Sequence, residues 1–492
     1  MKFGLEVQVI ENIISVLEQH PKVDKAFVFG SRAKGNYRPD SDIDIAIKAN
    51  EITTDDIIAL SVAIETKGIT HKFDLLAYNS IKEPALKEHI DRVGIEFYSR
   101  WRETKLNDIC KSIISGGTPL TSIKEYYENG TIAWIKTKEV LNNKIYDSEF
   151  KITELGLQNS SAKLLPINSI TIAMYGDGGT AGRVAINKIP LATNQACGNL
   201  IVNAEIADFQ FVFYYLLNSY EELVYLKSGS GQQNLNLKTL KDFTIELPPL
   251  NEQITIASIL SSLDDKIELL NHQNKTFEQL AETLFRQWFV EDAKIDIVPL
   301  KKYVEVIDNR GKTPPFSDIK TDYPIVEVKS LSNSDRFVNY DACEKYVNEE
   351  IYNNWFRKGH PIINDILIST VGSIGEMAYV IENKGGIAQN VVGLRPHNIS
   401  PFYIYQYLSL PKTRREIKDL DIGAVQPSIK VPHLLDLEIP IPKDIKLVME
   451  FEMQLIPIFE KMKVNHFQIK TLTQTRDTLL PKLMSGELRV EI

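Results

Sequence analysis

The sequence predicts a multidomain α+β protein, in which a small α/β domain precedes two similar α/β domains that each lead into a long helix. A chain of 492 residues is too long for one hydrophobic core. The first 100 or so residues alternate between helical and strand patterns, and the remainder repeats itself after about 195 residues. We expect a first domain over 1–100, a first repeat over 101–250 with its helix over 251–292, and a second repeat over 293–444 with its helix over 445–492.

The first segment has the pattern of an α/β unit. "EVQVIENIISVLEQH" (6–20) and "DDIIALSVAIET" (55–66) have helical periodicity. "KAFVFG" (25–30), "SDIDIAI" (41–47) and "KFDLLAY" (72–78) have the composition and alternation of strands.

Residues beyond 100 contain five motifs that occur twice in the same order, which indicates a duplicated domain. Two copies are too few, and the period is too long, for a solenoid. The pairs are "ISGGTPL" (114–120) with "DNRGKTPPF" (308–316), "WIKTKEV" (134–140) with "IVEVKSL" (325–331), "YGDGGTAGRVAI" (175–186) with "VGSIGEMAYVI" (371–381), "NQACGNLIV" (194–202) with "AQNVVGLRP" (388–396), and "GQQNLNLKTLKDFTIELPPL" (231–250) with "AVQPSIKVPHLLDLEIPIP" (424–442).

Each repeat leads into a helix with a heptad seam. Apolar residues occupy nine of ten seam positions from Ile256 to Trp288, and eight of ten equivalent positions from Phe451 to Leu483. This spacing is typical of a coiled coil between the two helices, although each helix packing only on its own domain is the alternative.

Two asparagines favour an antiparallel pairing of these helices. Asn274 is the sixth seam layer of the first helix, and Asn465 is the fifth layer of the second. In a parallel pair each amide would face an aliphatic side chain, which costs about 1–3 kcal/mol for an unsatisfied buried polar group. In an antiparallel pair the two amides meet, so they can hydrogen-bond and fix the register.

The bulk composition is that of an ordinary globular protein without a membrane span or a signal peptide. Cys110, Cys197 and Cys343 are far apart and odd in number, which favours a reducing cytoplasm over a disulfide framework. The net charge of −9 weighs against nucleic-acid binding unless the positive charge is segregated on the surface.

The two repeats resemble the DNA-specificity subunit of type I restriction–modification systems. The resemblance rests on "ELPPLNEQ" (246–253) before the first helix and "LLPKLMSGELRV" (479–490) at the end of the second. It implies two target-recognition domains that each read one half of a split site in double-stranded DNA. It also implies spacer helices that dock methyltransferase subunits, and a separate restriction and translocase subunit. The repeats themselves would need no cofactor, because S-adenosylmethionine would belong to the methyltransferase.

Candidate DNA contacts lie in matching loops of the two repeats. Lysines suit phosphate or base contacts, and amide and hydroxyl groups suit base edges, although a solvated loop residue is the alternative for each. The candidates are Lys136, Lys138, Gln232, Asn234, Lys329, Gln426 and Ser428.

The stretch "VFGSRAKGNYRPDSDIDIAI" (28–47) carries the pattern of a metal-dependent active site. Asp42 and Asp44 are two residues apart on one predicted strand, so their carboxylates project to one face and can share a divalent cation. Asp74 lies on the next predicted strand as a third carboxylate, a set that suits two-metal phosphoryl or nucleotidyl transfer. We expect Gly30 and Ser31 to contact phosphate oxygens at a strand-to-helix turn, and Arg32 and Lys34 to add positive charge. The alternative is an aspartate pair on a solvated strand end.

Together, "FGSRAKG" (29–35), "SDIDIAI" (41–47) and "FDLL" (73–76) resemble the minimal nucleotidyltransferases of the DNA-polymerase-β-like fold. The resemblance implies transfer of a nucleoside monophosphate, with Mg²⁺ and a nucleoside triphosphate, ATP being the expected one. The acceptor would be a protein or a small molecule, and several such domains are antitoxins that modify a small helical toxin. One hypothesis is therefore a DNA-specificity subunit with an appended nucleotidyltransferase. A second is a nucleotidyltransferase whose acceptor the DNA-binding scaffold recruits, and a third is an adaptor with neither activity.

Overall fold

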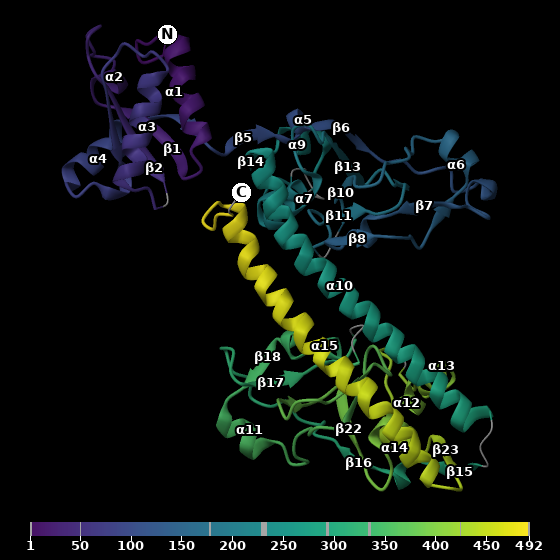
Figure 1. Ribbon diagram of the computed structural model, residues 1–492. Coiled ribbons are helices and arrows are strands. Elements are labelled where there is room, and N and C mark those ends of the chain that lie inside the picture. The colour runs from purple at the N-terminus through teal and green to yellow at the C-terminus, as the bar shows by residue number, and fades with distance from the viewer. Residues whose placement is uncertain are drawn as a thin grey trace. The chain divides into compact units, whose positions relative to one another are not determined.

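The computed structural model describes residues 2–49, 51–176, 179–227, 234–291, 295–332, 336–423 and 425–490 (Figure 1). The chain divides into two compact units, Met1–Ser261 with Thr478–Ile492, and Ser262–Asp477. Each unit has hydrophobic cores of its own. No helix in the described ranges is long and apolar enough to cross a membrane.

The N-terminal domain is a four-stranded sheet in the order β3-β2-β1-β4. Ile43, Ile45 and Ile47 of β2 are buried in the core on one face of the sheet, and Ala46 is buried on the other face. The strands are β1 (Val23–Phe29), β2 (Ile43–Ala49), β3 (Phe73–Ala77) and β4 (Ile95–Ser99), and the helices are α1 (Val7–Gln19), α2 (Gly30–Lys34), α3 (Thr54–Thr66) and α4 (Pro84–Val93).

The first repeat contains sheets of five, three and two strands. Its strands are β5 (Arg102–Lys105), β6 (Cys110–Ser115), β7 (Ile132–Ile135), β8 (Asn143–Ile145), β9 (Lys151–Ile152), β10 (Ile170–Ala173), β11 (Val184–Asn187), β12 (Leu191–Thr193), β13 (Cys197–Val202) and β14 (Thr244–Leu247). Its helices are α5 (Leu106–Ile109), α6 (Glu154–Gln158), α7 (Phe209–Asn218), α8 (Tyr220–Tyr225) and α9 (Leu237–Asp242).

The second repeat contains sheets of four, three and two strands. Its strands are β15 (Ile295–Pro299), β16 (Val304–Ile307), β17 (Tyr323–Val326), β18 (Lys345–Val347), β19 (Ile366–Ser369), β20 (Met377–Tyr379), β21 (Gly386–Ile387), β22 (Val391–Pro396) and β23 (Glu438–Pro442). Its helices are α11 (Glu349–Trp355), α12 (Pro401–Ser409), α13 (Pro411–Asp419) and α14 (Val431–Leu435).

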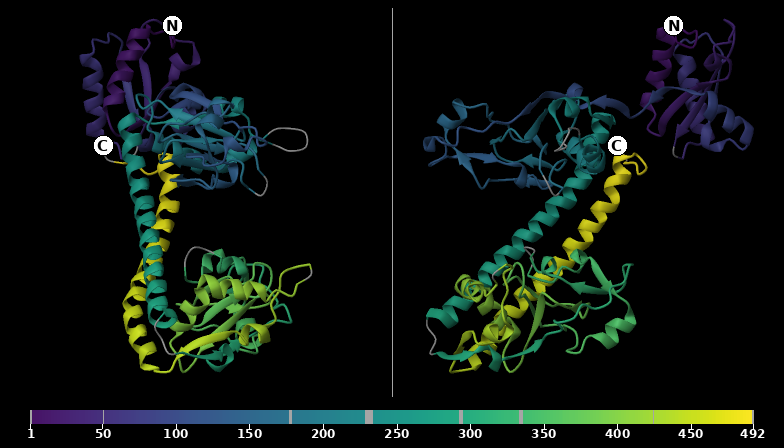
Figure 2. Two further views of the ribbon diagram at one scale, coloured as in Figure 1. Left: turned by 90° about the vertical axis from the view of Figure 1, so that its right-hand side faces the viewer. Right: turned by 180° about the vertical axis from the view of Figure 1, so that it is seen from behind.

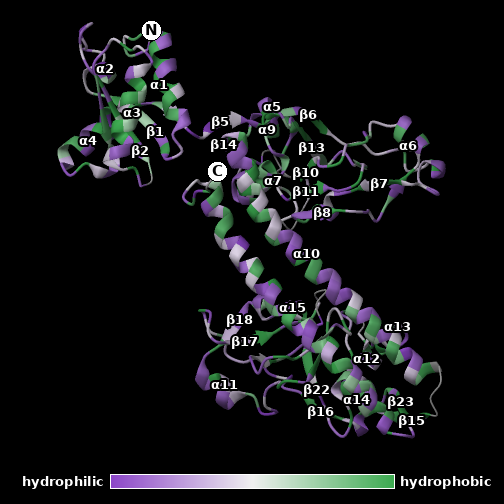
Figure 3. Cartoon of the chain, in the orientation of Figure 1, coloured by the Kyte–Doolittle hydropathy of each residue, from purple (hydrophilic) through white to green (hydrophobic). Residues whose placement is uncertain are grey.

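The strand topology shows that the two repeats are copies of one domain. The order β6-β13-β10-β11 in the first repeat is matched by β16-β22-β19-β20 in the second. In the small sheets, β7 pairs parallel with β12 and antiparallel with β9, and β17 pairs in the same way with β21 and β18. The terminal ribbon of β5 with β14 is matched by β15 with β23. Every residue of β10 and of β19, which lie inside the two large sheets, is buried, and Figure 3 colours the residues of the chain by hydropathy.

The long helices are α10 (Leu250–Arg286) and α15 (Lys446–Met484), and they pack antiparallel. Within the second unit the Phe285 and Phe451 rings lie 5.7 Å apart between centroids, and Arg476 Nη1 donates to Asp264 Oδ1 at 2.8 Å. Phe285, near the end of α10, therefore lies against the start of α15, and Asp264, earlier in α10, lies against the later part of α15. Both views in Figure 2 show the two helices side by side there.

The antiparallel register brings the two seam asparagines together. Asn465 Nδ2 donates to Asn274 Oδ1 at 2.9 Å, and both residues are buried, with exposed fractions of 0% and 8%. This is the pairing expected from the sequence, because the antiparallel register lets one amide donate to the other, whereas a parallel register would place each opposite an aliphatic side chain.

We expect Asn465→Leu to destabilise the second unit by about 1–3 kcal/mol, because it leaves the Asn274 carbonyl oxygen buried without its donor. The shift of the urea midpoint in the full chain measures this effect. The double variant Asn274→Leu/Asn465→Leu removes both amides and is expected to recover most of the loss. A double variant no more stable than the single one would contradict the pairing.

Candidate active site and nucleic-acid interface

The predicted catalytic carboxylates lie at one edge of the N-terminal sheet. β2 and β3 are parallel, and Asp44 pairs with Asp74 in the register, so both side chains leave the same face. Asp42 stands directly before β2 and is exposed, and Asp74 is exposed as well. Asp44 is half-buried on the strand.

The carboxylate of Asp44 is affected electrostatically by its two acidic neighbours. Burial raises the pKa of Asp44, the charges of Asp74 and Asp42 raise it further, and Arg32 lowers it. Hard oxygen donors with this mutual repulsion have the chemistry that a divalent cation requires. As the side chains stand, no group of three acidic, histidine or cysteine residues in the described ranges is arranged to hold a metal ion. The three carboxylates thus have the chemistry that a cation needs, and the strand register places Asp44 beside Asp74. In the described residues their side chains do not form a coordination shell.

Gly30 directly follows β1, next to the carboxylates, and has a backbone conformation that favours glycine. Its φ is +71°, and a Cβ placed on it would overlap with Asp44 Oδ2. The Asp44 carboxylate therefore lies directly against the Gly30 backbone. Ser31 follows half-buried in α2, and Lys34 is exposed near the end of that helix.

Arg32 adds positive charge beside Asp44, as expected, but it does so from a buried position that does not suit a phosphate contact. Its side chain is buried, with an exposed fraction of 2% for the residue, so it is not available to a phosphate group. Its guanidinium instead donates to the carbonyl oxygens of Phe3, Pro39, Ser41 and Asp42. These bonds fix the loop that carries Asp42 into β2. Arg32 is therefore a positioning residue for the carboxylates.

In each repeat, four loops meet at one end of the large sheet, which we call the loop edge. In the first repeat it comprises residues 115–120, 174–183 without 177 and 178, 194–196 and 234–236, and in the second it comprises residues 308–316, 370–376, 388–390 and 421–429 without 424.

The two loop edges repeat the same backbone hydrogen bonds. Met174 N donates to Ala196 O at 2.8 Å, and Leu235 N donates to Met174 O at 3.0 Å. In the second repeat Thr370 N donates to Asn390 O at 2.8 Å, and Ile429 N donates to Thr370 O at 2.8 Å. The duplication therefore extends to the loops.

A threonine–glutamine pair also occurs in both loop edges, and sequence reasoning missed it. Thr118 Oγ1 donates to Gln195 Oε1, and Gln389 Nε2 donates to Thr313 Oγ1. The signal was present, because the Gly-x-Thr-Pro motifs and the later glutamines match in the two repeats. Their separation in the chain hid the contact.

The predicted polar contacts occupy equivalent places in the two loop edges. Asn234 directly precedes Leu235, and Ser428 directly precedes Ile429, so the repeated hydrogen bonds place both residues alike. Gln426 is exposed in the same loop as Ser428. Gln232 lies outside the described residues.

The predicted lysine contacts follow the central strands of the small sheets. Lys136 follows β7, and its ammonium lies 3.6 Å from the centroid of the Phe150 ring. Lys138 and Lys329 occupy equivalent positions, and each forms an ion pair, with Glu149 and Glu344 respectively. Both lysines must exchange a carboxylate for phosphate if they contact DNA.

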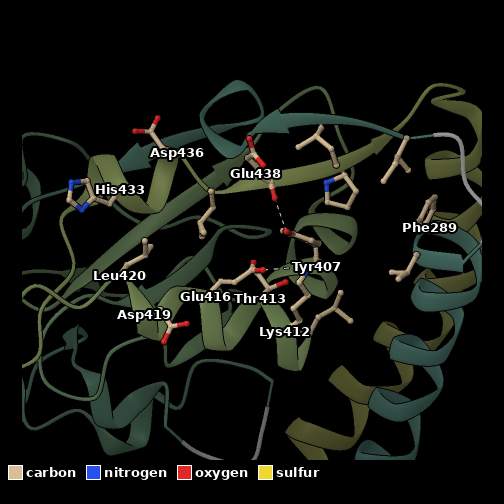
Figure 4. A pocket seen from close by; sticks show the side chains of 16 residues that line it. Phe289, Tyr407, Lys412, Thr413, Glu416, Asp419, Leu420, His433, Asp436 and Glu438 are labelled. Atoms are coloured by element: carbon tan, nitrogen blue, oxygen red, sulfur yellow. Dashed lines mark hydrogen bonds and ion pairs between the residues drawn. The ribbon is translucent and has the colours of Figure 1, made fainter.

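A pocket of about 770 Å³ in the second repeat lies apart from all predicted site residues (Figure 4). Its lining is mostly apolar, and Tyr407 Oη donates to Glu438 O at 2.7 Å across it. Lys412, Glu416 and His433 stand around it without converging on one point (Figure 4). The pocket therefore carries no catalytic constellation.

Comparison with known proteins assigns the two repeats to a family. The family model described as type I restriction modification DNA specificity domain matches residues 98–279 and 294–446. The MjaIX type I restriction enzyme specificity subunit of Methanocaldococcus jannaschii is 30% identical over 430 residues, which cover 80% of this chain and 94% of that protein. The chain belongs to the type I restriction–modification specificity subunits.

Two further specificity subunits extend the match. The HindI specificity subunit of Haemophilus influenzae is 22% identical over 79% of this chain and 100% of its own length. The crystal structure of the type I S subunit from M. genitalium has the same fold, with a TM-score of 0.51 at 18% identity over 80% of this chain and 96% of that one. Residues 11–103, which lie almost entirely before the specificity repeats, match the family model described as Polymerase beta, Nucleotidyltransferase.

The motif "ELPPLNEQ" of this specificity subunit has a structural role at the start of α10. Glu252 is buried and accepts hydrogen bonds from Arg100 Nε at 2.7 Å and Trp101 Nε1 at 3.3 Å. Gln253 Oε1 accepts from Asp208 N, and Gln253 Nε2 donates to Pro248 O, each at 2.8 Å. The motif thereby joins the helix to the first repeat and to the segment that follows the N-terminal domain.

Proposed function

We propose that this chain is the sequence-specific DNA-binding subunit of a type I restriction–modification complex and reads a split target. Residues 101–250 and 293–444 are the two target-recognition domains, and 251–292 and 445–492 are the spacer helices. The observation that carries the proposal is the duplicated loop edge, with the same strand order and the same hydrogen bonds in both copies. Two similar readers joined by an antiparallel helix pair match the twofold symmetry of duplex DNA.

The proposed complex divides its chemistry among subunits. The helices dock methyltransferase subunits, which bind S-adenosylmethionine, and a separate subunit restricts and translocates DNA in the cytoplasm. Asn234, Gln426 and Ser428 contact base edges, together with Gln232. Lys136, Lys138 and Lys329 contact phosphate groups, which fix the position of the reader on the duplex.

We propose further that residues 1–100 transfer a nucleoside monophosphate from a nucleoside triphosphate such as ATP. Asp42, Asp44 and Asp74 would hold Mg²⁺, which supplies charge neutralisation and Lewis acidity to such a reaction when bound. The Gly30 backbone, Ser31 and Lys34 would contact the phosphate groups. The support is the Asp44–Asp74 pairing against Gly30, together with the match of residues 11–103 to the nucleotidyltransferase family.

A second candidate function is protein nucleotidyl transfer as the main activity, with the DNA-binding scaffold recruiting the acceptor. The presence of all three expected carboxylates at one sheet edge favours an active enzyme over a relic. Under this hypothesis the acceptor is a small helical toxin-like protein.

Selection from a randomised duplex library tests the reader function in vitro. We expect the full chain, assembled with its methyltransferase subunit, to enrich duplexes with two short constant blocks at a fixed separation. The methyltransferase subunit alone is the control and should enrich none. A single continuous block, or no enrichment by the assembled complex, would contradict a bipartite reader.

A further inference from the structure

The loop edges of the two repeats differ in the segment that joins the first strand of the large sheet to the threonine–glutamine pair. Ile114 pairs with Asn199 and Ile307 pairs with Gly393, and each of these partners stands four residues after its glutamine, Gln195 or Gln389. Between the isoleucine and the paired threonine lie three residues in the first repeat (115–117) and five in the second (308–312). The segment is thus two residues longer in the second repeat, and it contains Asn309 and Arg310.

Asn309 anchors the longer loop. It is buried, with an exposed fraction of 7%, and its Nδ2 donates to Gly359 O at 2.9 Å. Its Oδ1 accepts from Lys358 N at 3.0 Å. These bonds fix the loop to the turn at Lys358 and Gly359, and they thereby fix the backbone next to Arg310.

Arg310 is held by a carboxylate on one edge and by a hydroxyl on the other. Its Nε donates to Asp308 Oδ1 at 2.9 Å, and its Nη2 donates to Asp308 Oδ2 at 2.7 Å. Its Nη1 donates to Thr370 Oγ1 at 3.2 Å, and Thr370 is fully buried. A guanidinium has five N–H donors, so two, one on each Nη, make no hydrogen bond within the described residues.

The Asp308 carboxylate remains ionised at neutral pH. Burial raises its pKa, but the hydrogen bonds and charge of Arg310 outweigh burial and leave the pKa below its usual range. The clamp on Arg310 is therefore a charge-assisted bidentate pair, which is stronger and more directional than a neutral hydrogen bond.

We propose that Arg310 reads a guanine in the half-site contacted by the second repeat, an inference that rests on the proposed DNA-reading function. Guanine offers two acceptors, O6 and N7, in the major groove, and arginine is the side chain that pairs with both. Asp308 and Thr370 hold the guanidinium in one orientation, so its remaining donors point in fixed directions. A contact with a phosphate group does not require such a fixed orientation. The side chain is one-quarter exposed, so its free donors are open to a partner.

Arg310 also distinguishes the second repeat from the first. The corresponding segment of the first repeat, residues 115–117, contains no arginine, while the threonine–glutamine pair is common to both repeats. Shared residues serve both half-sites alike, whereas Arg310 specifies the second half-site alone.

The duplex library selection tests this assignment with the full chain and its methyltransferase subunit. Wild type should enrich a guanine in one of its two blocks, and Arg310→Ala should lose the preference at that position while the other block is unchanged. Affinity for the wild-type site should fall by about 5- to 150-fold, the cost of one bidentate base contact, with no change for unrelated duplexes. Arg310→Lys should lose the preference as well, because lysine lacks the planar fork.

Lys358→Ala is the matched control, since it removes an exposed positive charge near the same loop. We expect it to leave both blocks intact. The proposal is overturned if Arg310→Ala leaves both blocks intact, or if it weakens binding to all duplexes equally and lowers the salt slope by about one, which marks a phosphate contact. Absence of any split motif with wild type would instead overturn the proposed reader function, so the two failures are distinguishable.

Discussion

Asp44→Asn is expected to abolish label transfer from radiolabelled ATP by the full chain, lowering the rate about 100-fold or more. Asp44 is the central carboxylate of the proposed site, between Asp42 along the strand and Asp74 in the register. A bound divalent cation supplies several kcal/mol of charge stabilisation, and each 1.36 kcal/mol changes a rate tenfold. Asparagine keeps the size of the side chain but removes the charge that the cation requires.

Asp55→Asn is the control for this experiment, because Asp55 is an exposed carboxylate in the first turn of α3 on the same domain. It should transfer label at the wild-type rate. DNA selection by Asp44→Asn should also be unchanged, because the repeats have cores of their own. Label transfer that survives in Asp44→Asn would rule out the proposed metal site.

Arg32→Ala is expected to destabilise the N-terminal domain by about 3 kcal/mol or more and to remove nucleotidyl transfer. The substitution leaves four backbone carbonyl oxygens without their charged donor, that of Phe3 in a buried bond and those of Pro39, Ser41 and Asp42 in part-buried ones. Hydrogen bonds to charged groups contribute about 1.5–3 kcal/mol each, and unsatisfied buried acceptors add to the loss. Thermal unfolding, followed by a probe in residues 1–100, together with label transfer, measures both effects.

Lys34→Ala is the matched control, because Lys34 is a basic residue in the same short helix but is exposed. It should leave the unfolding transition within about 0.5 kcal/mol of wild type, as surface substitutions do. If Arg32→Ala unfolds like wild type but loses activity, Arg32 acts on the substrate directly, and its assignment as a positioning residue is wrong.

The contrast between Arg32 and Lys34 shows what the motif alone predicts. A basic residue beside a glycine–serine turn suggests phosphate binding, and the sequence gives no sign of which side chain points inward. That depends on the path of residues 39–42, which places the carbonyl oxygens of Pro39, Ser41 and Asp42 around the Arg32 guanidinium. Sequence reasoning found the carboxylates, because alternation on a strand fixes their face, but it did not find the residue that positions them.

The helix pairing was predictable because a single geometric rule decides it. The heptad spacing assigned Asn274 to the sixth seam layer of the first helix and Asn465 to the fifth layer of the second. The free-energy cost of an unpaired buried amide then favoured the antiparallel register. The loop edges follow no such rule. Their contacts join segments about 75 residues apart, such as Thr313 and Gln389, and the greater length of the segment 308–312 becomes visible only once the strands are in register.

Methylome sequencing of cells with and without this chain tests the central claim most directly. We expect a split methylated motif that is present with the chain and an intact partner methyltransferase, and absent without the chain. The same motif in both strains, or no split motif when both proteins are present, would contradict the assignment of this chain as the DNA reader.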